Sequence, residues 1–255
     1  MTNQGAGALK PLKWYKDLAT RAGRIEAGAF LLEGDRAISQ VVHNHHGEIR
    51  EILFTAELPP RYQKFTNRRV TESQLRSICS SQTPQGTAAV VCMPGDIYSD
   101  NRPGKTGDKV LLLEDIQDPG NTGTLIRTAV AFGFSGVILS EKCADPFSPK
   151  CVQSTAGTVL SLWIRRTPGY LELMKALKRD SYKLIAADLK GDEDPSLLLG
   201  RGKLLLALGN EASGLSAAVL QAADSRIRIP INRDKAESLN VAACGAICMY
   251  LCRTS

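Results

Sequence analysis

Four apolar runs in the second half of the chain predict buried strands. They lie at residues 110–113, 136–139, 183–187 and 204–208. Their hydrophobicity is continuous rather than alternating, which is typical of parallel strands that are covered on both faces. Helical patterns follow at residues 122–132, 171–179, 215–222 and 240–252. This alternation of strand and helix predicts an α/β domain built around a parallel sheet.

The first half of the chain alternates in the same way over shorter segments. Apolar runs predict strands at residues 29–32, 52–54 and 87–91, and helical patterns occur at residues 35–42 and 72–79. The stretch that follows is rich in Pro, Gly, Asp and Asn and nearly devoid of aliphatic residues, which is typical of a linker. We therefore expect a smaller α/β domain over residues 1–93, a linker over 94–108 and a larger domain over 109–255.

The composition, with 43% hydrophobic and 23% charged residues, is that of an ordinary globular protein and excludes disordered and fibrous classes. The formal net charge of +6 fits a polyanionic partner such as a nucleic acid, although many basic proteins bind none. Basic residues gather near the N-terminus, at Lys10, Lys13, Lys16, Arg21 and Arg24. Such a cluster is either a solvated face or a phosphate contact.

Neither a membrane span nor a metal site is expected. No apolar stretch is long enough to cross a bilayer and residues 1–16 lack a signal-peptide core, so we expect a cytoplasmic or organelle-matrix protein. Seven cysteines without a Cys-x-x-Cys pair indicate neither a disulfide framework nor a zinc site. Cys244, Cys248 and Cys252 recur every four residues, which predicts one buried stripe of a helix.

Ligands of open parallel sheets bind at the carboxyl ends of the strands, and the loop after residue 113 is the first unusual one there. Its Pro-Gly pair makes a tight turn, Asn121 or Thr122 is placed to cap the next helix, and free amides at the start of that helix favour an anion. Arg127 would lie about one turn inside the helix. It is either a phosphate ligand or an ordinary surface arginine.

The second unusual loop, residues 208–215, directly follows a predicted strand. Gly209 and Gly214 let a ligand approach the backbone, and Glu211 is a carboxylate at a strand end, where a cationic or hydroxyl-bearing group can dock. A capping turn before the next helix explains the same glycines without a ligand.

The third unusual loop follows a short strand that is expected to stop at Pro230. Ser238 or Asn240 then begins the last helix, as a functional side chain or as an ordinary cap. Small residues in that helix suit close packing of backbone against backbone, at Ala242, Ala243, Gly245 and Ala246.

Competing nucleotide and hydrolase motifs are absent. Gly104-Lys105-Thr106 lacks the first glycine of a phosphate loop and precedes a strand instead of following one. No Gly-x-Gly-x-x-Gly follows a strand and no Gly-x-Ser-x-Gly occurs, which argues against a dinucleotide-dependent enzyme and against an α/β hydrolase.

Taken in order, the three loops resemble the signature motifs of the SpoU (TrmH-like) family of SPOUT RNA 2′-O-ribose methyltransferases. The matching elements are Asn121-x-Gly123-x-x-x-Arg127-Thr128-Ala129, Gly209-x-Glu211-x-x-Gly214-Leu215, and Ile229-Pro230 with Ser238-Leu239-Asn240-Val241-Ala242. The resemblance covers residues 109–253. The first domain is similar to the L30e-like RNA substrate-binding domain of many relatives, through Phe30-Leu31-Leu32-Glu33-Gly34-x-Arg36 and Thr83-Pro84-Gln85-Gly86.

The resemblance implies a trefoil-knotted α/β domain that forms a homodimer and uses S-adenosylmethionine, in a protein with an RNA substrate. It implies donor contacts at Leu208, Gly209, Asn210, Ile229, Pro230, Leu239 and Asn240. It implies active-site roles for Asn121, Arg127, Glu211, Ser238 and Asn240. Because a guanidinium has a pKa above about 12, Arg127 suits the holding of a phosphate or of the ribose oxygen better than proton removal.

The resemblance favours ribosomal RNA of the large subunit as substrate. A transfer RNA 2′-O-methyltransferase, and a non-catalytic RNA-binding or ribosome-assembly protein of the same fold, remain alternatives. Residues 231–237 depart from the family pattern, which has a methionine, a glycine and one fewer residue. This longer, basic loop leaves the contour of the donor pocket and the choice of substrate open.

Overall fold

A computed structural model describes residues 10–253 except residues 201 and 233. The chain divides into two compact units, one formed by residues 1–95 with 147–160 and the other by residues 96–146 with 161–255. Among the helices of the described residues, none combines the length and apolarity needed to cross a membrane.

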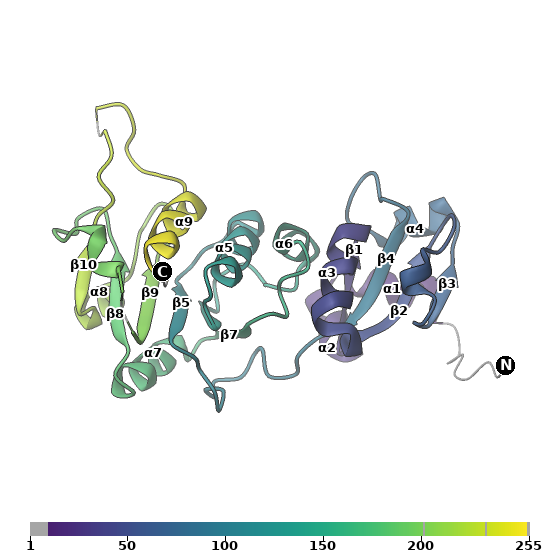
Figure 1. Ribbon diagram of the computed structural model, residues 1–255, viewed down its shortest axis with the longest axis horizontal. Helices are drawn as coiled ribbons and strands as arrows, with labels where there is room; N and C mark the ends of the chain where they lie inside the picture. The colour runs from purple at the N-terminus through teal and green to yellow at the C-terminus, as the bar shows by residue number, and fades with distance from the viewer. Residues whose placement is uncertain (1–9, 201, 233, 254–255) are drawn as a thin grey trace. The chain divides into compact units, whose positions relative to one another are not determined.

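The first unit contains a four-stranded sheet in the order β1-β4-β2-β3 (Figure 1). The strands are β1 (Ala29–Glu33), β2 (Ile49–Phe54), β3 (Asn67–Arg69) and β4 (Thr87–Cys92). Only the edge pair β2 and β3 runs parallel. The helices are α1 (Leu12–Asp17), α2 (Arg21–Ala27), α3 (Asp35–His45), α4 (Glu72–Ile78) and α6 (Pro149–Thr155).

The core of this unit joins α1 and α4 to one face of the sheet. Tyr15, Leu53, Leu75 and Val90 are buried there together. Arg24 is buried too, and it donates hydrogen bonds to the carbonyl oxygens that follow α1. It therefore closes the end of a helix, and its prediction as part of a basic surface cluster is wrong.

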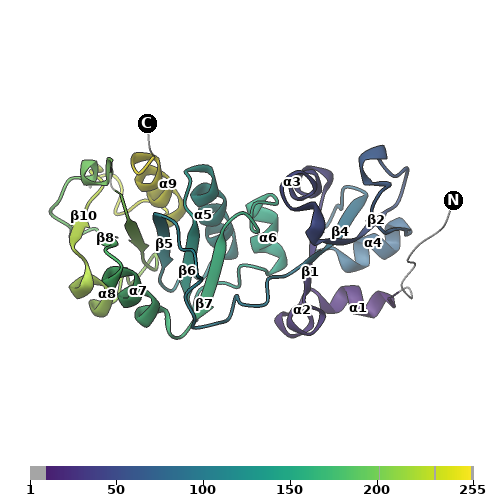
Figure 2. The same ribbon diagram turned by 60° about the horizontal axis from the view of Figure 1, so that its bottom comes forward.

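The second unit is a six-stranded parallel sheet in the order β10-β8-β9-β5-β6-β7. Its strands are β5 (Lys109–Leu113), β6 (Gly136–Ser140), β7 (Trp163–Thr167), β8 (Lys183–Ala187), β9 (Leu204–Leu208) and β10 (Ser225–Ile227). Its helices are α5 (Pro119–Ala131), α7 (Tyr170–Arg179), α8 (Ala217–Ala222) and α9 (Val241–Leu251). Figure 2 shows α5 and α9 on one face of the sheet and α7 and α8 on the other.

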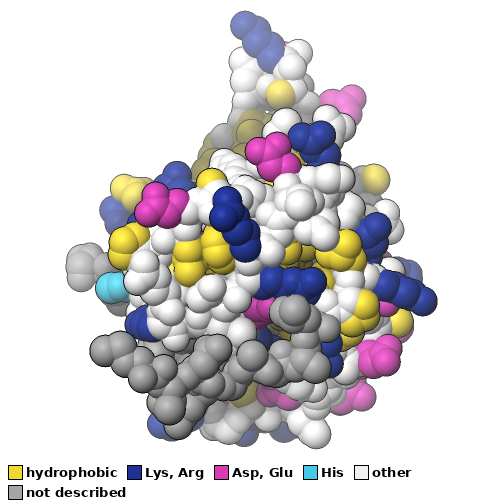
Figure 3. Space-filling model, turned by 90° about the vertical axis from the view of Figure 1, so that its right-hand side faces the viewer, with side chains coloured by type: hydrophobic (Ala, Val, Ile, Leu, Met, Phe, Trp, Pro, Cys, Tyr) yellow, Lys and Arg dark blue, Asp and Glu magenta, His cyan; other side chains and the backbone are white. Residues whose placement is uncertain are grey.

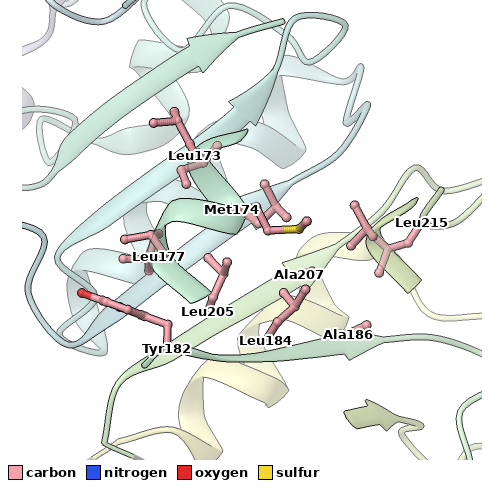
Figure 4. Close-up of a cluster of buried hydrophobic side chains, with 13 residues drawn as sticks. Leu173, Met174, Leu177, Tyr182, Leu184, Ala186, Leu205, Ala207 and Leu215 are labelled. Atoms are coloured by element: carbon pink, nitrogen blue, oxygen red, sulfur yellow. The ribbon is translucent and has the colours of Figure 1, made fainter. Parts of the chain in front are cut away.

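Helices on both faces explain the continuous apolar runs. Every residue of β5, β6 and β9 is buried, and alternate side chains of each strand point to opposite faces. Leu205 and Ala207 of β9 pack with Leu173 and Leu177 of α7 in the cluster drawn in Figure 4. The predicted parallel sheet is confirmed.

Several elements differ from the sequence predictions, and each difference has a local cause. Strand β7 has no apolar run because Arg165 and Arg166 interrupt it, yet Arg165 is buried and pairs with Asp96. The strand expected to reach Pro230 ends at Ile227, because its partner β8 ends at the residue paired with Ile227, Ala187. Beyond that point the chain leaves the sheet in a long loop (Figure 1).

The segment expected to be a linker is fixed along the second unit from residue 96 onward. Ile97 is buried, and its carbonyl accepts a hydrogen bond from the backbone amide of Arg166. Thr106 accepts one from the Tyr182 hydroxyl at 2.8 Å. The turn-forming composition therefore belongs to irregular backbone that packs beside β7.

Candidate active site

A cavity of about 320 Å³ opens at the carboxyl ends of β8, β9 and β10. Its walls come from the three loops that follow these strands and from the first turn of α9, at residues 187–190, 208–215, 227–229, 231, 238, 239, 241 and 244. These loops meet because the three strands are parallel neighbours, so that their carboxyl ends share one edge of the sheet. Segments that are far apart in the sequence thereby enclose one volume.

Hydrogen bonds join the three predicted motifs beside this cavity. Asn240 donates through Nδ2 to Oδ1 of Asn121 at 3.2 Å, and Asn121 donates through Nδ2 to Oε1 of Glu211 at 2.7 Å. The Oδ1 of Asn240 accepts from the amides of Ala242 and Ala243 and so caps α9. Because the cap fixes which atom of Asn240 is the donor, the orientation of all three side chains is determined.

Helix α5, which carries Asn121, begins earlier than its sequence suggests. Asp118 is its cap and accepts from the amide of Asn121 at 2.7 Å, with Pro119 in the first helical position. The prediction that Asn121 or Thr122 caps this helix is therefore wrong. Because Asp118 caps the helix, the side chain of Asn121 is left to donate through Nδ2 to Glu211.

The loop between β9 and α8 is closed on itself. The Oδ1 of Asn210 accepts hydrogen bonds from the amides of Ala212 and Ser213 at 2.9 and 3.0 Å. A Cβ on Gly209 would stand 2.3 Å from the carbonyl carbon of Gly214, which itself has a φ of +69°. Both glycines are thus required by the turn itself.

Most of the predicted donor contacts line the cavity. Those that do are Leu208, Gly209, Asn210, Ile229 and Leu239, together with the predicted active-site residues Glu211 and Ser238. Pro230 and Asn240 are not among the lining residues, and Asn121 adjoins the cavity through its bond to Glu211.

Arg127 lies apart from the cavity. Helix α5 begins at Pro119, so Arg127 is about two turns inside it and about 120° around the helix axis from Asn121. Its side chain is exposed and makes no hydrogen bond or ion pair with any residue that the structure describes. The cation is therefore free to meet an anion from outside the unit.

The loop after β8 is a part of the site that sequence reasoning missed. Asp188, Leu189 and Lys190 line the cavity, and Asp188 accepts from Nε of Arg226 at 3.0 Å, which ties β8 to β10. The only signal for these residues was their position after a predicted strand, because their types are ordinary for a surface turn.

The lining suits a small organic molecule with an apolar body and polar ends. The volume lies within the range of pockets that bind such ligands. Leu189 and Leu239 line it and remain 49% and 36% exposed, which leaves apolar surface for a ligand to cover. The backbone amides and carbonyls of Gly209 and Asn210, in the loop after β9, add hydrogen-bonding groups for the polar edge of a ligand's ring. S-adenosylmethionine, expected from the sequence, fits this set of residues.

Helix α9 packs closely against α5 and β9, as its small residues predicted. A Cβ on Gly245 would stand 2.3 Å from Cδ2 of Leu125 and 2.8 Å from Cδ1 of Leu208. Cys248 and Cys252 are buried beneath, whereas Cys244 is partly exposed and lines the cavity. The predicted cysteine stripe is thus correct for two of its three members. In the part of the chain that the structure describes, no group of three His, Cys, Asp or Glu side chains has the spacing of a metal site.

The chain is similar to known proteins over nearly its whole length. Residues 108–250 match the SpoU rRNA Methylase family and residues 10–89 the MRM3-like substrate binding domain. The chain is 32% identical to the 23S rRNA (guanosine(2553)-2′-O)-methyltransferase RlmP of Bacillus subtilis, over 94% of each chain. It is 30% identical to the 23S rRNA (uridine(2479)-2′-O)-methyltransferase of Streptomyces viridochromogenes, over 93% of this chain and 87% of that one.

Solved structures of methyltransferases are similar to this chain as well. The SpoU methyltransferase AviRb from Streptomyces viridochromogenes, in complex with the cofactor AdoMet, matches with a TM-score of 0.82 and 30% identity, over 94% of this chain and 96% of that chain. A protein of the TrmH family from Porphyromonas gingivalis matches with a TM-score of 0.79 and 29% identity, over 97% of this chain and 99% of that chain.

Proposed function

We propose that this chain, which belongs to the SpoU rRNA methylase family, transfers a methyl group from S-adenosylmethionine to a ribose 2′-hydroxyl of large-subunit ribosomal RNA. One observation carries the proposal. The Asn240, Asn121 and Glu211 side chains, from three separate motifs, form one hydrogen-bonded row beside a cavity that suits the donor.

The loops after β8, β9 and β10 would hold the donor. Leu208, Ile229 and Leu239 supply apolar surface for it, and Gly209 and Asn210 supply backbone groups. Pro230 and Asn240, which do not line the cavity, act by shaping the loop that does. When bound, S-adenosylmethionine supplies a methyl carbon attached to a positively charged sulfur, the electrophile of the reaction.

Positioning of the ribose is the main task left to the protein, because displacement at a methyl carbon requires the reacting atoms in line. Asn121 and Glu211 are oriented by their hydrogen bonds and in turn orient the acceptor hydroxyl. Ser238, which is exposed at the cavity, offers a further hydroxyl to the ribose. Arg127 holds a phosphate of the RNA, a role that suits a free guanidinium.

The two parts of the chain would divide RNA binding and catalysis. We assign RNA binding to residues 1–93, a connecting role to 94–108 and methyl transfer to 109–255. The match of residues 10–89 to a substrate-binding domain supports this. Exposed lysines of α1, Lys13 and Lys16, are available to phosphates. On the side of the molecule drawn in Figure 3, basic side chains are spread over the surface instead of forming one block.

We also infer a cytoplasmic homodimer whose catalytic domain is knotted, the architecture that the resemblance implies. Apolar side chains on α9 support a contact with a second copy. Ile247 and Tyr250 are exposed there, and the Tyr250 ring stands edge-on to Phe132 at the end of α5. Large exposed apolar groups side by side favour a protein contact.

The test is methyl transfer in vitro with tritiated S-adenosylmethionine. Large-subunit ribosomal RNA, small-subunit ribosomal RNA and transfer RNA are offered separately, and the modified position is mapped as a site that resists alkaline cleavage. We expect one 2′-O-methyl group in the large-subunit RNA. Methylation of transfer RNA alone would show that the substrate is transfer RNA and not ribosomal RNA. RNA binding without donor binding would show that the chain is a non-catalytic RNA-binding protein of the same fold.

A further inference from the structure

A buried carboxylate behind the active-site loop has no place in the reaction described above. Glu114, the first residue after β5, is 3% exposed and lies outside the donor cavity. A second cavity, of about 520 Å³, includes Glu114 and Tyr170 in its walls. Ser213, Gly214 and Leu215 line both cavities, so the loop after β9 is the partition between them.

Both oxygens of Glu114 are engaged. Oε2 accepts from the backbone amide of Ser216 at 2.7 Å, and Oε1 accepts from the hydroxyl of Tyr170 at 2.5 Å. Ser216 is the cap of α8, the residue at which the loop returns to regular structure. Burial and the adjacent Glu114 carboxylate raise the pKa of Tyr170, so that its hydroxyl remains a donor.

Glu114 and its neighbour also hold the beginning of the same loop. The amide of Glu114 donates to the carbonyl of Leu208 at 2.9 Å, and Asn210 donates through Nδ2 to the carbonyl of Asp115 at 2.8 Å. Two consecutive residues that directly follow β5 therefore bind the loop at both ends. Between these ends lies Glu211, with Leu215 anchored in the hydrophobic cluster of Figure 4.

The backbone at this point is strained. Asp115 has a φ of +58°, a left-handed conformation that is unfavourable for a residue with a side chain. Ser140 stabilises it by accepting from the Asp115 amide at 2.9 Å and donating to Oδ1 at 2.6 Å. Non-glycine residues keep such a conformation where the surrounding structure enforces it, and here it directs the Asp115 carbonyl toward Asn210.

We propose that Glu114 and Tyr170 are positioning residues for the methyl donor: the Glu114 carboxylate, oriented by the Tyr170 hydroxyl, holds the loop of residues 209–216 in the shape that binds the donor and presents Glu211. This inference rests on the proposed function. It assigns a role to two residues that touch neither the donor nor the RNA.

The test is donor affinity in the full chain, measured by calorimetry with S-adenosylmethionine, together with the melting temperature of each variant. Glu114→Ala removes the acceptor of Ser216 and should weaken donor binding about tenfold or more. Glu114→Gln should remain close to the wild type, because its oxygen accepts from Ser216 and its amide donates to the Tyr170 oxygen. Tyr170→Phe should weaken binding several-fold while preserving the volume of the ring.

Tyr182→Phe is the matched control. Tyr182 is a buried tyrosine of the second unit, and its hydroxyl binds Thr106 and Gly107, far in sequence from the loop. We expect this variant to melt at a lower temperature with unchanged donor affinity. In kinetics, Tyr170→Phe should raise KM for the donor and also lower kcat at saturation, because the same loop presents Glu211, whereas Tyr182→Phe should change neither.

Each other result has a definite meaning. Wild-type affinity in both Glu114→Ala and Tyr170→Phe overturns the positioning role. If Tyr182→Phe weakens donor binding equally, general destabilisation explains the effect and the positioning role is overturned. If Glu114→Gln binds the donor no better than Glu114→Ala, the negative charge and not the hydrogen-bond geometry is the cause, and the positioning role is again overturned. Failure of the wild type to bind S-adenosylmethionine overturns the proposed function itself.

Discussion

Asn121 and Glu211, 90 positions apart in the sequence, share a hydrogen bond of 2.7 Å from the Asn121 Nδ2 to a carboxylate oxygen of Glu211. The bond crosses from the first turn of α5 to the loop after β9. It is possible because β5 and β9 are parallel neighbours whose ends lie at the same edge of the sheet. The catalytic predictions depend on this pair.

Replacing Asn121 with Ala should reduce methyl transfer by about 100-fold or more while leaving donor affinity within a few-fold of the wild type. The Glu211 carboxylate loses its donor and Asn240 loses its acceptor, but the lining of the cavity is intact. Single-turnover rates and donor calorimetry measure the two effects. Thr124→Ala, an exposed position on the same helix, is the control. Unchanged turnover in Asn121→Ala would reject the assignment.

Replacing Arg127 with Ala should weaken RNA binding. It should also reduce the slope of the logarithm of RNA affinity against the logarithm of salt concentration by about one, the value of one phosphate contact. Arg127→Lys should restore part of the affinity, since the charge remains while the planar fork is lost. Filter binding at several salt concentrations measures both. Arg179→Ala, which removes an exposed arginine from α7 on the other face of the sheet, should leave the slope unchanged. Equal slopes in the two alanine variants would contradict a phosphate role for Arg127.

Replacing Leu239 with Ala should weaken donor binding roughly fivefold to tenfold. Leu239 lines the cavity and is 36% exposed, so a bound ligand can cover the part of its side chain that the free chain leaves exposed. Leu199→Ala is the matched control, because Leu199 is 56% exposed and lies outside the cavity. Equal donor affinity in the two variants would place the donor elsewhere.

Replacing Gly245 with Val should destabilise the chain by about 1 to 3 kcal/mol, because the new side chain meets Leu125 and Leu208 where α9 crosses α5. Urea unfolding followed by circular dichroism measures the loss. Gly245→Val loses no helix propensity, because Gly is the poorer helix former. Ala243→Val, at an exposed position of the same helix, introduces the same side chain without the steric conflict and should cost less than about 1 kcal/mol. A similar loss in both variants would show that the contact with Leu125 and Leu208 is not responsible.

Alkaline pH should destabilise the first unit through Tyr15. Burial and the hydrogen bond to Glu51 raise the pKa of Tyr15 from 10.0 to about 12. Because the folded pKa is the higher one, the stabilisation is complete below pH 10 and is lost between pH 10 and about 12. The difference in unfolding free energy between the wild type and Tyr15→Phe should therefore shift in favour of Tyr15→Phe as the pH rises through this interval. A difference independent of pH would mean that Tyr15 titrates normally.

Local signals in the sequence determined much of this protein. Continuous apolar runs identify β5, β6, β8 and β9 because a strand between two layers of helices needs apolar side chains on both faces. The motif residues Asn121, Glu211 and Asn240 were identified through the family resemblance that their order along the chain carries. The cap of α9 by Asn240 was among the alternatives that its position before an apolar helix offered.

Only the tertiary structure decided which of these residues meet. Strand β7 and the site segment of Asp188 to Lys190 were not predicted, because a buried arginine and an ordinary turn carry no local pattern. The start of α5 depended on Asp118 instead of Asn121. The separation of Arg127 from the cavity and the hold of Glu114 on the loop after β9 follow from strand order and helix rotation. These contacts join residues that are far apart in the sequence. Hydrophobic periodicity indicates only which face of its own helix or strand a residue occupies, so it cannot predict such contacts.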